Sequence, residues 1–229
     1  MSKPKTSVHL EFSDKYNRLQ AEVYLEKHRE NWSRRLSHSR DVQLVRKSLD
    51  LAGNPKLILD LPCGTGRFWP VLRERSVREL IAADNSQDML DVAATAYPDL
   101  IDGGVRLLKT SAFAIELPDC SVDCVFCMRL MHHIGLSDDR LAVLKEFHRV
   151  TRDSVILSLW VDGNFKAWRR KRLERTRRPE ARHSYQNRFV ITAQQAESEF
   201  CAAGFDIAGH YDFLPGYSMW RVYILKKKQ

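Results

Sequence analysis

A glycine-containing turn that follows an apolar run carries the clearest indication of chemistry in this chain. The segment DLPCGTG occupies residues 60–66. Glycines let the backbone turn sharply and approach a ligand closely, and a helix that begins behind the turn supplies unpaired backbone amides. Asp84 lies 18 residues after Gly66, at the end of the next apolar run, where a carboxylate can accept both hydroxyls of a ribose. The spacing predicts a site for a ligand that contains a nucleoside.

Two widespread nucleotide-binding motifs do not fit this turn. The G-x-G-x-x-G pattern of nicotinamide-dependent dehydrogenases needs a third glycine where this chain has Trp69. An indole at that position would obstruct the close packing of helix on strand that glycine permits. The phosphate-binding pattern G-x-x-x-x-G-K-[ST] does not occur in the sequence.

The elements that would position these residues alternate between short apolar runs and helical segments. Strands are expected at 57–61, 80–83, 105–108, 122–128 and 154–161, followed by a closing antiparallel pair near 205–211 and 219–225. Helices are expected at 14–53, 67–75, 86–96, 137–150, 165–178 and 192–203. This alternation predicts an α/β fold with a mostly parallel sheet covered on both faces. Ligands of such sheets bind at the carboxyl ends of the strands.

The chain ends its first helical segment at Gly53-Asn54-Pro55, a combination that stops helices. We therefore expect an N-terminal helical cap at 1–53 and the main domain at 54–229, with a basic segment at 163–190.

The five cysteines predict buried reduced thiols rather than a metal site. Cys124 and Cys127 lie in an apolar run, where their odd spacing places them on opposite faces of a strand. No second pair of cysteines or histidines completes a zinc site in the sequence, so no metal is expected.

The full sequence has a formal net charge of +8 at pH 7. Its positive charge is concentrated in one segment. Residues 166–188 contain ten basic side chains: Lys166, Arg169, Arg170, Lys171, Arg172, Arg175, Arg177, Arg178, Arg182 and Arg188. Only Glu174 and Glu180 oppose them. Such asymmetry indicates an anionic partner, and a solvated helical face is the alternative interpretation.

Three segments resemble motifs of class I methyltransferases. DLPCGTG is similar to their first motif, D-x-G-x-G-x-G, and ADNSQDML to their second. LPDCSVDCVFCMRLMHHI resembles the region around the fourth strand of the subfamily called methyltransferase type 11. The resemblance covers about residues 55–160. It implies a Rossmann-like seven-stranded sheet with an antiparallel last strand, and S-adenosylmethionine as the cofactor.

By this resemblance, Asp60 and the glycine backbone hold the methionine end of the cofactor, and Asp84 holds its ribose. Pro62 departs from the family pattern because it replaces the first glycine, and Ser111 stands where an acid often contacts the adenine. The full expected cofactor set is Asp60, Pro62, Cys63, Gly64, Thr65, Gly66, Asp84, Asn85, Met89, Ser111, Ala112, Phe113 and Met128.

Methyl transfer to an alcohol would be assisted by a general base. His132 and His133 follow the expected fourth strand and are candidates, with a structural role as the alternative. Asp162 follows the fifth strand and is a further candidate, although it could instead cap the helix after it.

The basic segment predicts where an anionic substrate or ligand would bind, because guanidinium groups bind phosphate in a bidentate manner. The candidates are Arg129, Arg169, Arg170, Arg178, Arg182, Tyr185 and Arg188. Pairing with a core acid is the alternative for Arg129. Three partners fit: a phosphorylated glycan or glycolipid near a membrane surface, RNA, and a small regulator such as a cyclic dinucleotide.

DLPCGTGRFWP and SLWVDGNFKAWRR faintly resemble bacterial methyltransferases associated with lipopolysaccharide. This favours O-methylation of a cell-envelope saccharide or lipopolysaccharide-related glycolipid. An RNA methyltransferase and a regulatory protein that senses an anionic ligand are the competing hypotheses.

No run of the sequence has the length and apolarity of a membrane-spanning helix or a signal peptide. A cytoplasmic location is therefore expected, with peripheral contact at the inner membrane as an additional hypothesis. The sequence does not predict an oligomeric state.

Overall fold

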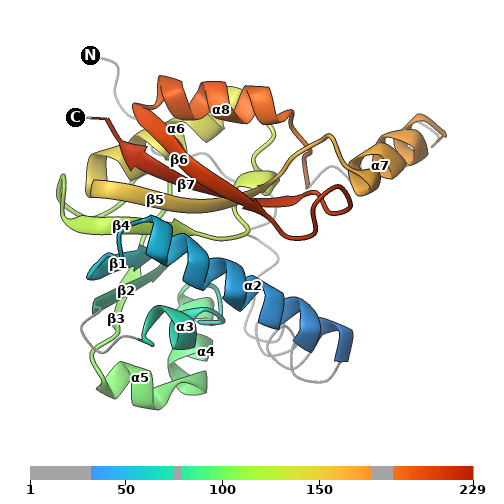
Figure 1. Ribbon diagram of the computed structural model, residues 1–229. Coiled ribbons are helices and arrows are strands. Elements are labelled where there is room, and N and C mark those ends of the chain that lie inside the picture. The colour runs from blue at the N-terminus through green and yellow to red at the C-terminus, as the bar shows by residue number, and fades with distance from the viewer. Residues whose placement is uncertain (1–31, 75–78, 177–187, 229) are drawn as a thin grey trace.

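The fold consists of a central sheet between two layers of helices (Figure 1). The computed structural model describes residues 32–74, 79–176 and 188–228. Within these ranges, no helix is long and apolar enough to span a membrane.

Seven strands form one sheet in the order β3-β2-β1-β4-β5-β7-β6. The strands are β1 (Leu57–Asp60), β2 (Glu79–Asp84), β3 (Arg106–Lys109), β4 (Val122–Cys127), β5 (Thr151–Trp160), β6 (Phe205–Asp212) and β7 (Trp220–Lys227). Strands β1 to β5 pair in parallel, and β7 is antiparallel to both β5 and β6. The predicted α/β class, the mostly parallel sheet and the antiparallel last strand are confirmed.

The helices match most of the predicted segments. They are α2 (Trp32–Leu51), α3 (Trp69–Leu72), α4 (Gln87–Ala96), α5 (Pro98–Asp102), the 3-10 turn η2 (Met131–His133), α6 (Ser137–Val150), α7 (Phe165–Thr176) and α8 (Ala193–Ala202). The helix expected at 67–75 is much shorter than predicted, because the residues before Trp69 form turns. The sequence reading also missed α5 and η2.

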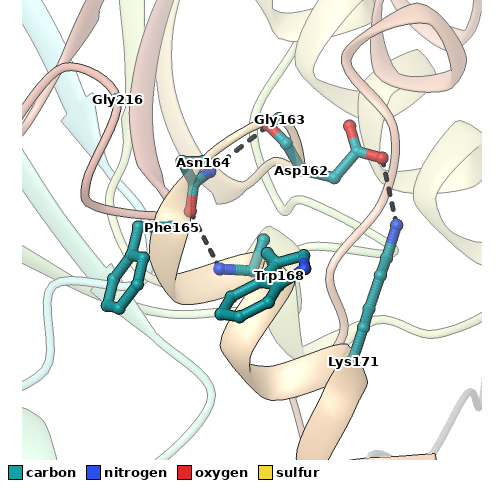
Figure 2. Close-up of a pocket in the computed structure, with 8 residues that line it drawn as sticks. Asp162, Gly163, Asn164, Phe165, Trp168, Lys171 and Gly216 are labelled. Carbon is teal, nitrogen blue, oxygen red and sulfur yellow. Dashed lines mark hydrogen bonds and ion pairs between the residues drawn. The ribbon is translucent and has the colours of Figure 1, made fainter.

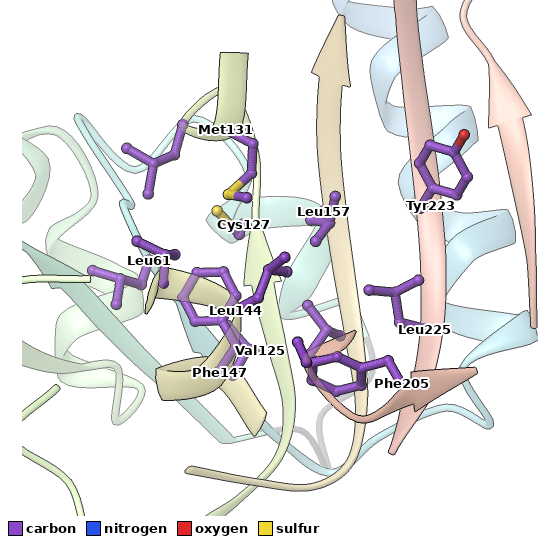
Figure 3. Packing of buried hydrophobic residues seen from close by; sticks show 14 of the residues in the cluster. Leu61, Val125, Cys127, Met131, Leu144, Phe147, Leu157, Phe205, Tyr223 and Leu225 are labelled. Atoms are coloured by element: carbon purple, nitrogen blue, oxygen red, sulfur yellow. The ribbon is translucent and has the colours of Figure 1, made fainter. Parts of the chain in front are cut away.

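Alternation along the strands separates the core into two clusters, one on each face of the sheet. Val125 and Cys127 face α6 and α8, where Phe147 packs with them (Figure 3). Cys124 and Phe126 face the other way, toward α2, α3 and α4. The predicted placement of Cys124 and Cys127 on opposite faces is confirmed. The predicted burial is wrong for Cys120 and Cys201, which are exposed. No group of metal-ligating side chains occurs among the residues described.

Helix α2 is the described part of the predicted N-terminal cap. Its residues Leu44, Val45 and Leu49 are buried in the same cluster as Ile58 of β1 and Ile224 of β7. This part of the cap therefore contributes to the main core. Residues 1–31 of the predicted cap lie outside the described residues.

Candidate active site

The turn after β1 is anchored to the strands on both sides of it. The Leu61 amide donates to the Phe126 carbonyl of β4 at 2.9 Å, and the Cys63 amide donates to the Ala83 carbonyl of β2 at 2.8 Å. These bonds fix the turn at the carboxyl ends of β1, β2 and β4, where ligands of parallel sheets bind. Cys63 and Thr65 are buried in this turn.

The two glycines of the turn have different reasons to be glycine. Both have positive φ, 53° at Gly64 and 75° at Gly66, a conformation that side chains disfavour. A Cβ on Gly66 would lie 2.9 Å from the Trp69 ring, whereas one on Gly64 would meet nothing within 4 Å. Trp69 thus packs under the turn, and the space at Gly64 is open to a ligand.

Asp84 connects the end of β2 to the glycine turn. One carboxylate oxygen accepts the Gly64 amide and the other accepts the Ser86 amide, each at 3.0 Å. The side chain is 5% exposed, and burial raises its pKa. Each oxygen keeps a second lone pair, so the carboxylate can still accept hydroxyl groups from a ligand.

Asp60 is the second buried carboxylate at this point. It is 1% exposed, and its Oδ2 has no hydrogen-bond partner among the residues that the structure describes. Burial, and next the charge of Asp84, hold its pKa well above the usual range, and the nearby Trp69 side chain only partly opposes this rise. A buried, unpaired carboxylate oxygen is costly and would be relieved by a ligand that brings a donor or a positive charge.

The other expected cofactor residues surround this turn on neighbouring elements. Ser86 caps α4 by accepting the Met89 amide, which places Asn85 directly between Asp84 and the cap. Ser111 begins the turn after β3, where its hydroxyl accepts the Phe113 amide at 3.2 Å. The remaining members are Ala112, half-buried in that turn, Met128, buried just after β4, and Pro62, half-buried in the glycine turn.

Comparisons with known proteins agree with this geometry. Residues 59–159 match the family profile described as a methyltransferase domain. A Schizosaccharomyces pombe protein named as methyltransferase-like is 34% identical over 109 residues, which are 48% of this chain and 39% of that protein. Magnesium protoporphyrin IX methyltransferase from Synechocystis, solved with bound SAH, has a TM-score of 0.75 and 16% identity, and the match covers 94% of this chain and 97% of that one. Residues 59–159 are therefore similar to methyltransferase domains, and the fold of the chain is that of a solved methyltransferase.

The same fold also occurs in a protein with another activity. The cyclase SpnF has a TM-score of 0.63 and 15% identity, and the match covers 82% of this chain and 80% of that one. The chain spans less than half the length of the curated methyltransferase relatives that it matches. The fold alone therefore does not determine the reaction, which depends on the side chains at the site.

An aromatic cluster surrounds His132, which lies in η2 after the end of β4. The imidazole stacks on Trp160 of β5 with ring centroids 4.9 Å apart and meets Trp220 of β7 edge-on at 4.7 Å. His132 is 4% exposed and Trp160 is 7% exposed. Neither His132 Nδ1 nor Trp160 Nε1 has a hydrogen-bond partner within the described part of the chain. Two stacked rings thus each bury a polar atom that has no partner among the described residues.

Arginines surround this aromatic cluster. The guanidinium carbons of Arg170 and Arg188 lie 5.2 and 5.8 Å from the Trp160 ring centroid, and that of Arg129 lies 5.3 Å from the Trp220 centroid. Burial lowers the pKa of His132 to about 2, and the charges of its neighbour His133 and of these arginines act in the same direction. The imidazole is therefore neutral near pH 7.

His133 is the last residue of η2, and its ring centroid lies 4.0 Å from that of His132. It is half-buried. The two histidines therefore sit together, with His132 alone inside the aromatic cluster.

Arg129 was expected either to orient an anionic substrate or to pair with a core acid, and the structure shows the second arrangement. Its guanidinium lies 2.8 Å from the buried Asp41 carboxylate of α2, and Arg67 reaches the same carboxylate oxygen at 2.6 Å. Arg67 also donates to His38 at 3.1 Å. Asp41 thus connects α2 to the residue after the glycine turn and to the end of β4.

The side chain of Asp162 pairs with a residue outside the aromatic cluster around His132. It forms an ion pair with Lys171 at 3.2 Å at the edge of an open hollow (Figure 2). The alternative that Asp162 caps the following helix is wrong, because Asn164 fills this role: its side chain accepts the Ala167 amide at 3.0 Å and donates to the Val161 carbonyl at 2.7 Å.

Sequence reasoning missed four residues of this site: Asp41, Arg67, Trp160 and Trp220 as partners of the predicted ones. Trp160 at the end of the fifth strand was a usable signal, since that end faces the ligand. Nothing in the local sequence connects Asp41 or Trp220 with His132, because they come from α2 and β7. The predicted anion-binding residues Arg178, Arg182 and Tyr185 lie outside the described residues, and Arg169 is exposed on α7.

Proposed function

We propose that this chain is an S-adenosylmethionine-dependent methyltransferase that acts on an oxygen of an anionic acceptor, a phosphorylated cell-envelope saccharide or glycolipid. When bound, the cofactor supplies a methyl group activated by its sulfonium. The observation that carries the proposal is the pair of buried carboxylates, Asp60 and Asp84, beside the open glycine turn.

The donor set of the cofactor fits these residues. Asp84 is held by two backbone amides and can accept ribose hydroxyls on its remaining lone pairs. Asp60 Oδ2 has no hydrogen-bond partner among the described residues and would gain from the positive charge and the N–H donors of the methionine end. Gly64 leaves room for close backbone approach. The residues therefore suit a nucleoside with a cationic substituent.

The aromatic cluster supports an acceptor with a negative charge and a flat or apolar face. Arg170 and Arg188 lie over Trp160, where their guanidinium groups can bind a phosphate or carboxylate. Trp160 Nε1 is a buried donor that has no partner among the described residues, and an acceptor oxygen would satisfy it. The indole rings offer a surface on which a sugar ring can pack.

His132 is the residue best suited to take the proton from an acceptor hydroxyl. Its imidazole is neutral, and its Nδ1 carries no hydrogen bond from the described residues. An anionic acceptor would offset the arginine charges that contribute to its low pKa, so bound acceptor would make His132 a stronger base. The domain would also hold the reacting oxygen close to the methyl group, a proximity effect worth several kcal/mol.

Calorimetry with S-adenosylmethionine and its demethylated product tests the cofactor site. We expect binding by the wild-type chain and a loss of at least about tenfold in affinity for Asp84→Ala, because a hydrogen-bonded charged acceptor is removed. If well-folded protein gave no binding heat with either compound, the proposal would be wrong.

Transfer of a labelled methyl group tests the acceptor. The expected product is a labelled glycolipid or saccharide fraction, with His132→Phe reducing turnover more than cofactor affinity. Label found in RNA alone would instead support the RNA hypothesis. Binding of a cyclic dinucleotide without any methyl transfer would support the regulatory hypothesis.

A further inference from the structure

Three aromatic rings and a leucine are exposed together at one end of the molecule. Phe165, Trp168, Leu214 and Tyr217 are 48%, 56%, 45% and 46% exposed. We refer to these four residues as the aromatic tip. The Phe165 ring stacks on Tyr217 with centroids 5.7 Å apart and lies 5.9 Å from Trp168. Figure 1 shows their two segments, α7 and the connection between β6 and β7, at the same end of the molecule.

The backbone holds these two segments together. The Phe165 amide donates to the Gly216 carbonyl at 2.9 Å, and the Lys166 amide donates to the Tyr217 carbonyl at 3.1 Å. Asn164 caps the start of α7. The exposure of the rings is therefore built into the fold, since ordered hydrogen bonds fix the segments that present them.

An open hollow of about 450 Å³ lies beside the aromatic tip, lined in part by Phe165 and Trp168 (Figure 2). Its polar side chains already have partners in the chain: Asp162 pairs with Lys171, and Asn164 bonds to backbone groups. The hollow therefore offers mainly apolar and aromatic surface to whatever covers it. Exposed apolar surface of this kind marks an interaction site.

The surroundings of the aromatic tip are cationic. Lys166 lies 5.1 Å from the Tyr217 ring centroid, and Arg172 lies 5.7 Å from that of Trp168. Arg169 is exposed on the same helix. Aromatic side chains with lysines and arginines around them are typical of protein surfaces that contact anionic lipid, where the rings enter the interface and the cations meet the head groups.

We propose that the aromatic tip docks this chain onto the surface of a membrane that contains anionic lipid. An RNA partner could stack on the rings, but it offers nothing to Leu214. Arg170 follows Trp168 by two residues in α7, so its side chain projects about 200° around the helix from that of Trp168. The Arg170 guanidinium lies over the Trp160 ring. Docking would thus bring the candidate acceptor site close to the lipid. The docking itself does not depend on methyl transfer.

Vesicle sedimentation of the full chain tests the proposal without cofactor or acceptor. We expect binding to vesicles of phosphatidylcholine mixed with phosphatidylglycerol and little binding to phosphatidylcholine alone. The double variant Phe165→Ala/Trp168→Ala should weaken binding by about tenfold or more, because two rings lose their apolar contact. Leu107→Ala is the matched control: Leu107 is 38% exposed on β3, at the opposite edge of the sheet, and its removal should change nothing.

The emission of Trp168 gives a second measurement that does not depend on the alanine variants. Trp168→Phe should keep vesicle binding, and its difference spectrum from the wild type isolates Trp168. That emission should shift to the blue with anionic vesicles. Equal binding of the double variant and the wild type, or an unshifted Trp168 emission, would overturn the proposal. So would RNA binding that outcompetes the vesicles and disappears in the double variant.

Discussion

At the scale of a single residue, the buried carboxylate of Asp60 lowers the stability of the ligand-free chain. Its carboxylate is buried, and Oδ2 has no partner in the described ranges. Its pKa is raised by burial and next by Asp84. A carboxyl group whose folded pKa lies above its unfolded value takes up a proton on folding. Its effect on stability is therefore most favourable at low pH and is lost as the pH rises through the unfolded and then the folded pKa.

We predict that Asp60→Asn raises the free energy of unfolding of the ligand-free chain at pH 7 by about 1 kcal/mol or more, because each unit of pKa shift corresponds to about 1.4 kcal/mol. The same variant should bind S-adenosylmethionine at least about tenfold more weakly, since it lacks the negative charge. Urea unfolding and calorimetry measure the two effects. Asp84→Asn is the contrast: Asp84 accepts two backbone amides, so the amide should give no such gain. Equal stability of the wild type and Asp60→Asn at pH 7 would contradict this account.

His132 has the opposite pH behaviour. Burial first, and then His133 and three arginines, lower its pKa to about 2. The unfolded chain therefore binds a proton at His132 below about pH 6.5 that the folded chain does not, and stability is lost as the pH falls.

We predict that His132→Phe makes the fall in unfolding free energy below pH 6 shallower by up to about 1.4 kcal/mol per pH unit, the value for one proton. Phenylalanine keeps a ring beside Trp160 and Trp220. Urea unfolding of both proteins between pH 6 and pH 4 measures the difference. Parallel pH profiles would show that His132 charges in the folded chain.

At the level of elements, the site depends on how α2 is joined to the loops after β1 and β4. The buried Asp41 receives Arg67 at 2.6 Å and Arg129 at 2.8 Å. Arg129 has a φ of 68°, and its amide donates to Ser158 of β5 at 2.9 Å. Asp41 thus compensates two partly buried cations that border the glycine turn and the aromatic cluster.

Asp41→Asn should lower the free energy of unfolding by about 2 kcal/mol, because it leaves two partly buried guanidinium groups without a counter-charge. Cofactor affinity should fall as well, since Arg67 directly follows the glycine turn. Thermal unfolding and calorimetry are the measurements. The matched control is Arg46→Ala, which removes an exposed pair between α2 and Glu74 and should leave both quantities unchanged. If the two variants behaved alike, Asp41 would have no such role.

At the level of the whole molecule, a buried ion pair joins the helices on one face of the sheet. Arg140 of α6 and Glu199 of α8 form two hydrogen bonds of 2.8 and 2.6 Å, with side chains 2% and 8% exposed. Arg140 also donates to the Ile134 and Gly135 carbonyls at 3.0 and 2.9 Å. The pair therefore connects α8 to the segment that carries His132.

Glu199→Gln should destabilise the fold by about 3 kcal/mol, because it leaves the buried Arg140 without its counter-charge. We expect one cooperative transition in which secondary and tertiary signals are lost together, since α6 and α8 share one core cluster. Asp153→Asn removes an exposed pair with Lys226 and should cost less than about 1 kcal/mol. A large loss in both variants would argue against a special role of the buried pair.

The order of residue types along the chain determined the fold class and the part of the site formed by the glycine turn and Asp84. Apolar runs that alternate with helical segments predict the sheet, and the turn at 60–66 with Asp84 follows from local spacing, because each of these residues ends or follows a strand. The parts of the fold that sequence reasoning missed, α5 and η2, have no apolar periodicity that could reveal them.

Tertiary structure alone decided the surroundings of His132 and Arg129. Asp41, Trp160 and Trp220 come from α2, β5 and β7, and they meet because β7 inserts beside β5 and α2 packs across the sheet. The sequence position of a charged or aromatic residue does not predict which distant residue it contacts. Long-range packing decides which arginine pairs with a carboxylate and which histidine is buried away from solvent. The sequence does not show this packing.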